Sequence, residues 1–365
     1  MIVDDRVLPG GERTVLRLKE LYRRTGFLPY KMSKFEEYDL YGRNKDFLIS
    51  ERVLTFTDTN GKLMALKPDV TLSIIKNSPD PATGVARVFY DENVYRPSAG
   101  TRTFRELRQV GLEAYGDVGE LCVLETILLA ARSLETIAPG GGVLMVSHLA
   151  ILEEAISALD LPREAQAMLW KAIGEKDTQE IERICLNENV NIQAYERMRR
   201  VASLRGSLEE VLSSPDLPRE GAEASSFRRI LSFLAQSPLA ARICVDFSVD
   251  GDIRYYNGIL FKGYVRGIPS AVLSGGQYDR LMKTMHRASR AIGFAVYCDR
   301  LERLFSEERS PDADVLLLAP DNADGARVMA RAEELRRQGK TVSVQTAPPA
   351  DGVFGTMERF GEENT

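Results

Sequence analysis

Acids, amides, arginines and tyrosines recur in four short segments that lie far apart in the chain. The segments are 66–71 (LKPDVT), 96–113 (ending in FRELRQVGLE), 255–258 (YYNG) and 274–279 (SGGQYD). Carboxylates and amides can pair with ammonium and imidazole groups, and aromatic rings can form a shaped wall around them. Arginines bind phosphate or carboxylate oxygens in a bidentate manner and stabilise accumulating negative charge. Brought together, these residue types would suit a site for a small polar ligand.

In order and type, the four segments resemble motifs of class II aminoacyl-tRNA synthetases, and of histidyl-tRNA synthetase in particular. The run from Arg96-Pro97 to Glu113 is similar to motif 2, and segment 274–279 leads on to AIGF at 291–294. The resemblance covers residues 1 to about 304. It implies an α+β fold in which a class II synthetase-like antiparallel sheet is flanked by helices.

The resemblance also implies a pocket for histidine. Asp69 and Thr71 take the positions of the synthetase's Glu and Thr that hold the α-amino group, while Glu113 and Tyr278 match the pair that reads the imidazole. Because Asp69 is shorter than the family's Glu, its contact would need a water molecule or a closer backbone. Taken singly, each residue could also be structural. The complete implied set of histidine-binding residues is Asp69, Thr71, Gln109, Glu113, Tyr256 and Tyr278.

The cations needed for adenylate formation depart from the synthetase pattern. Asn93 stands three residues before Arg96-Pro97, where the synthetase has an arginine that touches the histidine carboxylate and the α-phosphate. Gly251 stands at another catalytic arginine position, with Arg254 three residues later, and Gln277 replaces a further arginine. Losing one such group typically costs about 2.7–4 kcal/mol of transition-state stabilisation. We therefore expect no catalytic residues and no enzymatic activity of the chain itself.

Two arginines remain at motif positions. Arg105 corresponds to a motif 2 arginine and Arg300 to the motif 3 arginine, so both are candidates for residual nucleotide or anion contacts. The alternative is that they are ordinary arginines that form salt bridges or pack against their neighbours.

Composition narrows the classes of partner. The net charge of -5 provides no global positive field to collect tRNA, so tRNA binding is not expected. Two histidines and four cysteines without a CxxC pair predict no metal site, no disulfide and no cofactor. The amino terminus resembles no secretion signal, and no apolar run is long enough to span a membrane, so we expect a cytoplasmic protein without membrane contact.

Hydrophobic periodicity predicts the elements that must position these residues. Apolar residues at helical spacing predict helices at 12–25 and 120–134. Asn60-Gly61 between two apolar runs predicts a β-hairpin, and 85–90 and 107–114 have strand patterns.

Changes in composition divide the chain into two domains. Residues 1–305 are expected to form the synthetase-like domain, with a helical insertion at about 148–240, followed by a linker at 306–312. Residues 313–365 read as one βαβ unit, which resembles a truncated, half-length anticodon-binding domain with the last 20 residues as a frayed end.

A synthetase relative with a histidine pocket, lost ATP arginines and a truncated anticodon domain resembles the regulatory subunit of ATP phosphoribosyltransferase. In that family the subunit activates a short catalytic subunit in the first step of histidine biosynthesis and is required for feedback inhibition by histidine. The resemblance implies three partners: the short-form catalytic subunit, a second copy in a dimer, and histidine as effector. Two alternatives stay open. One is a divergent active histidyl-tRNA synthetase that uses Arg254 or another cation, and the other is a stand-alone histidine or tRNA sensor.

Overall fold

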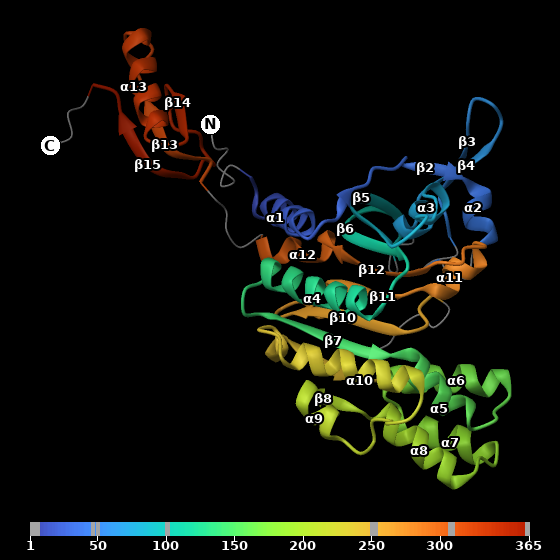
Figure 1. Ribbon diagram of the computed structural model, residues 1–365. Helices are drawn as coiled ribbons and strands as arrows, with labels where there is room; N and C mark the ends of the chain where they lie inside the picture. The colour runs from blue at the N-terminus through green and yellow to red at the C-terminus, as the bar shows by residue number, and fades with distance from the viewer. Residues whose placement is uncertain are drawn as a thin grey trace. The chain divides into compact units, whose positions relative to one another are not determined.

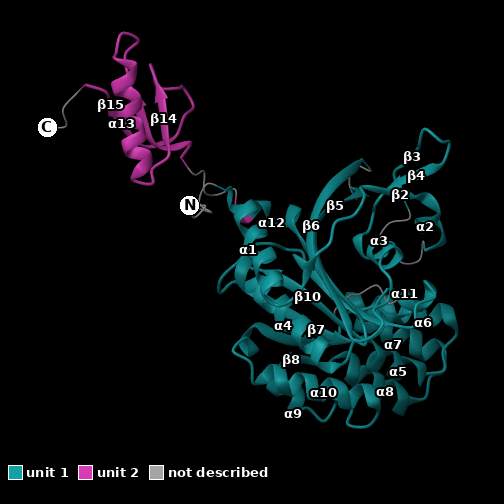
Figure 2. Ribbon diagram, turned by 45° about the horizontal axis from the view of Figure 1, so that its top comes forward, with its two compact units in different colours: residues 1–303 teal, residues 304–365 magenta. Residues whose placement is uncertain are grey.

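The computed structural model describes residues 8–44, 48, 52–98, 103–248, 255–305 and 311–361. The chain divides into two compact units, Met1–Arg303 and Leu304–Thr365 (Figure 2). The boundary lies close to the expected one at residue 305. Most of the expected linker, residues 306–310, lies outside the described residues, as do Gly251 and Arg254.

A nine-stranded sheet forms the centre of the first unit, with the order β1-β5-β6-β12-β11-β10-β7-β9-β8 (Figure 1). Neighbouring strands are antiparallel except in the pairs β1 with β5 and β7 with β9. The sheet confirms the expected α+β, synthetase-like class. Its strands are β1 (Leu28–Pro29), β5 (Val85–Pro97), β6 (Phe104–Gly116), β7 (Gly142–His148), β8 (Arg205–Ser207), β9 (Ile243–Asp246), β10 (Ile259–Val265), β11 (Leu273–Gln277) and β12 (Arg290–Tyr297).

Helices α1 (Gly10–Arg24) and α4 (Glu120–Ile137) pack against this sheet and against each other. The apolar stripe of α1 turns Leu18 and Tyr22 into the core, where both are fully buried. The Tyr22 hydroxyl and the Ser133 hydroxyl form a buried hydrogen bond of 3.0 Å between the two helices. A hydrogen bond at this place satisfies two polar groups that burial would otherwise penalise.

A small sheet, β2-β4-β3, stands beside the main sheet and is built around the expected hairpin. The strands are β2 (Phe35–Glu37), β3 (Thr55–Thr57) and β4 (Leu63–Leu66), and the adjoining helices are α2 (Tyr38–Arg43) and α3 (Val70–Asn77). Asp58 Oδ1 accepts hydrogen bonds from the backbone N–H groups of Asn60 and Lys62, and Gly61 has a φ of 78°. The turn therefore has the side-chain bonding and positive φ that Asp, Asn and Gly favour.

The insertion between β7 and β9 is mainly helical, as the chain's Leu-, Glu- and Ala-rich composition indicates. Pro162 immediately precedes α6, the second helix of the insertion, and Ser207 forms a capping box with Glu210 at the start of α9. One element was not expected, because β8 lies within the insertion and adds a strand to the main sheet. The helices are α5 (Leu149–Ser157), α6 (Arg163–Glu175), α7 (Thr178–Asn187), α8 (Ile192–Ala202), α9 (Leu208–Ser213), α10 (Ala222–Ala235) and the 3-10 helix η3 (Ala240–Arg242).

Two short helices complete the first unit near its last strands. They are α11 (Asp279–Thr284), which directly follows Tyr278, and α12 (Cys298–Phe305), which directly follows β12. Because α11 directly follows the candidate Tyr278 and α12 contains the candidate Arg300, the segments after β11 and β12 carry part of the predicted site.

The second unit is a three-stranded parallel sheet with the order β14-β13-β15 and helix α13. Its elements are β13 (Ala313–Leu318), α13 (Gly325–Arg337), β14 (Val342–Gln345) and β15 (Phe354–Arg359). The prediction of a frayed end is wrong for β15, which pairs along the length of β13. Arg331 of α13 holds Glu358 of β15 through hydrogen bonds of 2.7 and 3.0 Å. This strand is short and mostly polar, so its sequence lacks the apolar run of a buried strand.

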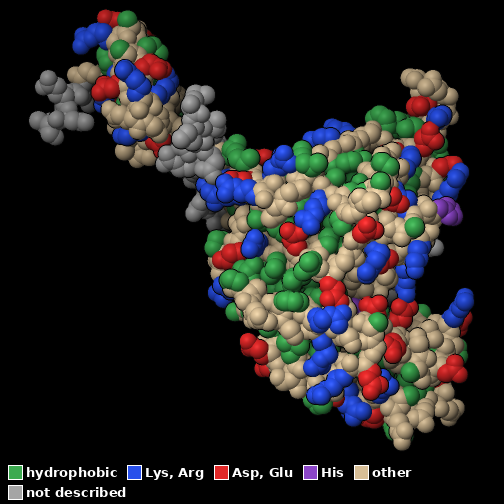
Figure 3. Space-filling model, in the orientation of Figure 1, with side chains coloured by type: hydrophobic (Ala, Val, Ile, Leu, Met, Phe, Trp, Pro, Cys, Tyr) green, Lys and Arg blue, Asp and Glu red, His purple; other side chains and the backbone are tan. Residues whose placement is uncertain are grey.

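Among the described residues, no helix combines the length and apolarity that crossing a membrane requires. Lys and Arg side chains are interspersed with Asp and Glu over the face of the molecule in view in Figure 3.

Candidate ligand-binding cavity

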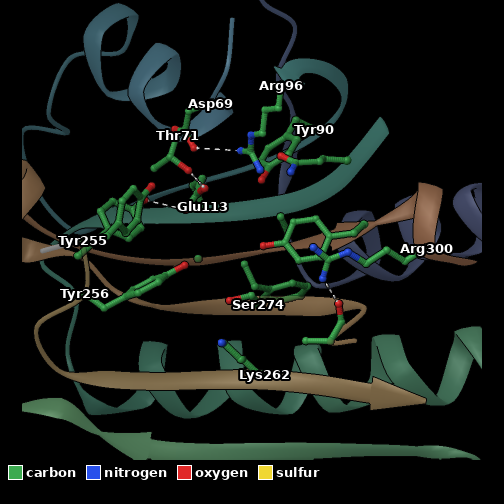
Figure 4. A pocket seen from close by; sticks show the side chains of 17 residues that line it. Asp69, Thr71, Tyr90, Arg96, Glu113, Tyr255, Tyr256, Lys262, Ser274 and Arg300 are labelled. Carbon is green, nitrogen blue, oxygen red and sulfur yellow. Dashed lines mark hydrogen bonds and ion pairs between the residues drawn. The ribbon is translucent and has the colours of Figure 1, made fainter. Parts of the chain in front are cut away.

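A cavity of about 290 Å³ opens between the main sheet and the start of α3 (Figure 4). All six residues expected to bind histidine line it, although they come from the start of α3, from β6 and from the segments next to β10 and β11. Its other walls come from residues that the sequence did not single out for this role. These are Tyr90, Arg96, Tyr255, Lys262, Ala271, Ser274, Gly293, Phe294, Ala295 and Tyr297, together with Arg300, which was a candidate for anions.

Glu113 is the most buried charged group of the cavity. Thr71 Oγ1 donates to its Oε1 over 2.7 Å, and the Tyr278 hydroxyl donates to its Oε2 over 2.7 Å. Burial raises the pKa of Glu113 to about 8, against the lowering effect of these two hydrogen bonds, and the nearby Asp69 raises the pKa further. Glu113 therefore carries a proton at neutral pH, and a ligand with a basic nitrogen could share that proton.

Asp69 combines a structural and a site position. Its Oδ1 accepts from the Leu72 backbone N–H over 2.9 Å, so it caps the amino terminus of α3. Its Oδ2 lies 3.7 Å from a guanidinium nitrogen of Arg96. Burial raises the pKa of Asp69, while Arg96 and the backbone hydrogen bonds lower it. Asp69 therefore has a structural role as a helix cap, and the same residue also lines the cavity.

Gln109 and Tyr90 supply polar groups to the middle of the cavity. Gln109 is 3% exposed and lines the cavity. Tyr90 is buried, and its hydroxyl lies so close to Gly111 that a Cβ there would overlap it. Both side chains line the cavity, so their amide and hydroxyl groups could form hydrogen bonds with a ligand there.

Aromatic rings form one wall. Tyr255 lies 4.8 Å from Tyr256 and 5.9 Å from Tyr278, measured between ring centroids. Gly293 lies opposite Glu113 in the pairing of β12 with β6, and a Cβ at Gly293 would overlap the Glu113 carboxylate. The absence of a side chain at Gly293 thus makes room for Glu113 in the cavity.

The arginine of β5 that faces the cavity is Arg96. Asn93 does not line the cavity, because it lies opposite Arg108 in the β5–β6 pairing, and Arg108 bonds to Asp91 and to Glu12 of α1. Residues three apart on a strand point to opposite faces. The prediction that Asn93 marks a lost cavity arginine is therefore corrected: Arg96 supplies a cation from this strand, and its Nε donates to the Pro68 carbonyl over 2.7 Å.

The other three expected positions differ in their placement. Arg300 lines the cavity on the side away from Asp69 and Thr71 (Figure 4). Arg105 is exposed on β6 and does not line the cavity. Gln277 is also outside the cavity lining, and its Oε1 accepts from the Ile259 backbone N–H over 2.8 Å, so this side chain joins β11 to β10.

The largely antiparallel sheet and the cavity at its centre define a class II aminoacyl-tRNA synthetase-like protein. The family model described as histidyl-tRNA synthetase matches residues 11–301, and the chain belongs to this family. This confirms the resemblance that the motifs predicted.

Similarity extends to proteins named as regulatory subunits. An ATP phosphoribosyltransferase regulatory subunit of Moorella thermoacetica is 28% identical over 89% of this chain and 85% of its own length. A Bacillus halodurans structure described as an ATP phosphoribosyltransferase regulatory subunit/histidyl-tRNA synthetase superposes with a TM-score of 0.77 and 20% identity, covering 98% of this chain and 96% of that one. A chain of the ATP phosphoribosyl transferase (HisG:HisZ) complex of Thermotoga maritima superposes with a TM-score of 0.60 and 19% identity, over 78% and 96% of the two chains. The two structures show likeness of fold.

Proposed function

We propose that this chain is the non-catalytic regulatory subunit of ATP phosphoribosyltransferase. In this role it activates a short catalytic subunit in the first step of histidine biosynthesis and makes the complex sensitive to histidine. The observation that carries the proposal is that the six residues expected to bind histidine all line one cavity. The name of the Moorella thermoacetica relative supports the choice of partner, and so does the described assembly of the Thermotoga maritima complex.

Histidine fits the cavity in charge and in hydrogen bonding. Its α-ammonium group would lie at Asp69 and Thr71, and its carboxylate would lie at Arg96. Its imidazole would bind Glu113, whose two oxygens already accept from Thr71 and Tyr278. A site of this kind rejects amino acids without a ring nitrogen, because they would offer no acceptor for the proton on the buried Glu113 carboxyl.

Feedback inhibition requires histidine to bind two states of the assembly with different affinity. A coupling free energy of about 1–3 kcal/mol is sufficient for a useful response. We propose that regulatory chains assemble as dimers within this complex, and that the histidine cavity supplies the ligand end of the coupling.

The test separates inhibition from activation. In a reconstituted complex, Tyr278→Phe keeps the ring but removes the hydroxyl that donates to Glu113, so the histidine concentration for half inhibition should rise by about tenfold. Activation by the variant should equal that of wild type. Tyr195→Phe, at a partly buried tyrosine of α8 outside this cavity, is the matched control and should change neither property. Unchanged inhibition in Tyr278→Phe would place the effector site elsewhere.

An active histidyl-tRNA synthetase is a second candidate, favoured by one observation. Arg96 places a cation in the cavity, close enough to bind a carboxylate or phosphate oxygen. ATP–pyrophosphate exchange that depends on histidine would support the synthetase, and its absence in a chain that binds histidine would support the regulatory subunit.

A further inference from the structure

The end of the cavity away from Asp69 is occupied by a stacked pair of side chains from the chain itself. The Arg300 guanidinium lies over the Tyr297 ring, with 4.3 Å between its central carbon and the ring centroid. Arg300 Nη1 donates to the backbone carbonyl of Ala271. Tyr297 is the last residue of β12 and Arg300 lies in the first turn of α12, so both ends of the pair are fixed by regular structure.

The Tyr297 ring lies against the face of the Arg300 guanidinium on which a nucleobase would stack. Arginine binds bases by lying flat against them, and it binds aromatic side chains in the same way. Because Tyr297 already covers one face of the Arg300 guanidinium, a purine could stack on that face only after the tyrosine ring had moved away. Nη1 is likewise engaged by Ala271, which fixes the guanidinium in its present orientation.

The size of the cavity points in the same direction. Its volume of about 290 Å³ is at the lower limit of the roughly 300–1,000 Å³ that is usual for ligand pockets. Such a volume accommodates an amino acid at the end formed by Asp69, Thr71 and Glu113. A nucleobase stacked on the covered face of Arg300, beside that amino acid, would overlap the Tyr297 ring in its present position.

We propose that Tyr297 is a specificity-determining residue that closes the cavity to adenine nucleotides, so that it accepts an amino acid alone. The proposal rests on the proposed function insofar as the ligand is histidine. It explains how a synthetase-like cavity with Arg96 and Arg300 in place can remain a sensor, since a substrate for adenylation cannot bind beside the amino acid.

Direct binding of ATP to variants of the full chain tests the proposal. Equilibrium dialysis with radiolabelled ATP and Mg²⁺ would compare wild type with Tyr297→Ala, which removes the ring, and Tyr297→Phe, which keeps it. Tyr297→Ala should bind ATP at least about tenfold more tightly than wild type, which is the ratio expected for one base–guanidinium stack. Tyr297→Phe should match wild type. Adding Arg300→Ala to Tyr297→Ala should abolish the gain.

Two results would overturn the proposal. The first is that the wild-type chain binds ATP tightly, with the affinity expected for Tyr297→Ala. The second is that Tyr297→Ala has no higher affinity for ATP than wild type although its thermal unfolding midpoint is unchanged. If Tyr297→Ala does not fold, Tyr297→Ser is measured in the same way. The readout is independent of histidine. Failure of the chain to bind histidine would contradict the proposed function, whereas the ATP comparison would still decide the role of Tyr297.

Discussion

Replacing Glu113 by glutamine should remove the alkaline limit of histidine binding. The carboxyl group of Glu113 is 2% exposed and accepts hydrogen bonds only from two hydroxyl groups, Thr71 and Tyr278, among the described residues. Burial raises the pKa of Glu113 to about 8. The groups that face it are Asp69 and several tyrosines, so the described surroundings place no cation in direct contact with the carboxyl.

The proton count gives the expected pH profile. Free histidine has a ring pKa of about 6.5, and the complex holds one proton between the imidazole and Glu113. Between about pH 6.5 and pH 8, free protein and free ligand together also hold one proton, so the affinity should be highest and nearly constant there. Below about pH 6.5 the ligand must release a proton on binding, and above about pH 8 the protein must take one up. Affinity should therefore fall by about tenfold per pH unit on each side.

Glu113→Gln carries no titrating group, so its alkaline limb should disappear while the acid limb, which belongs to the ligand, remains. Isothermal titration calorimetry between about pH 5.5 and pH 9, in pairs of buffers with different ionisation enthalpies, measures both the affinity and the protons exchanged. Wild-type affinity that continues to rise above pH 8 would refute the reasoning. An alkaline limb that persists unchanged in Glu113→Gln would refute it as well.

Three further predictions concern stability. Gly293→Ala should abolish histidine binding and lower the free energy of unfolding by about 1–3 kcal/mol, because the new Cβ would overlap the Glu113 carboxylate; calorimetry and urea unfolding measure the two effects. Lys67, which is fully buried, is paired with Glu92 over 2.7 Å, so Glu92→Ala should cost about 3–5 kcal/mol in urea unfolding, and the double variant with Lys67→Met should recover most of the loss. Deleting residues 353–365 should remove β15 and abolish hydrogen-exchange protection in β13, while α4 stays protected. If β13 in the deletion variant were as protected from hydrogen exchange as in the full-length chain, the second unit would not need β15 to stay folded.

Local signals were sufficient for the elements whose contacts are local. The hairpin at Asn60-Gly61 and the helices at 10–24 and 120–137 follow from turn chemistry and from helical spacing of apolar residues, which need no partner to be recognised. The strand β15 could not be found in this way. Its residues are mostly polar, and it is held by pairing with β13 and by Arg331, both distant in sequence.

The six cavity members were predicted from the resemblance of the motifs, and all six line the cavity, although only Gln109 and Glu113 lie on a strand. The cations were harder to predict, because the face toward which a strand residue points depends on register. The sequence assigned the cavity position on β5 to Asn93. Arg96 lies three residues later, on the opposite face of the strand, and it is Arg96 that lines the cavity. Gln277 was interpreted as a lost site residue, whereas it bonds to a neighbouring strand. Tyr297 gave no signal in the sequence, because its effect depends on the guanidinium of Arg300 that stacks on it.

The central claim is tested most directly by mixing this chain with a short-form ATP phosphoribosyltransferase catalytic subunit from the same source. The measurement is the rate of phosphoribosyl-ATP formation by the mixture and by each chain alone, with and without histidine. The account predicts that the mixture is far more active than either chain and that histidine lowers its activity. A catalytic subunit whose activity is the same with and without this chain would contradict it.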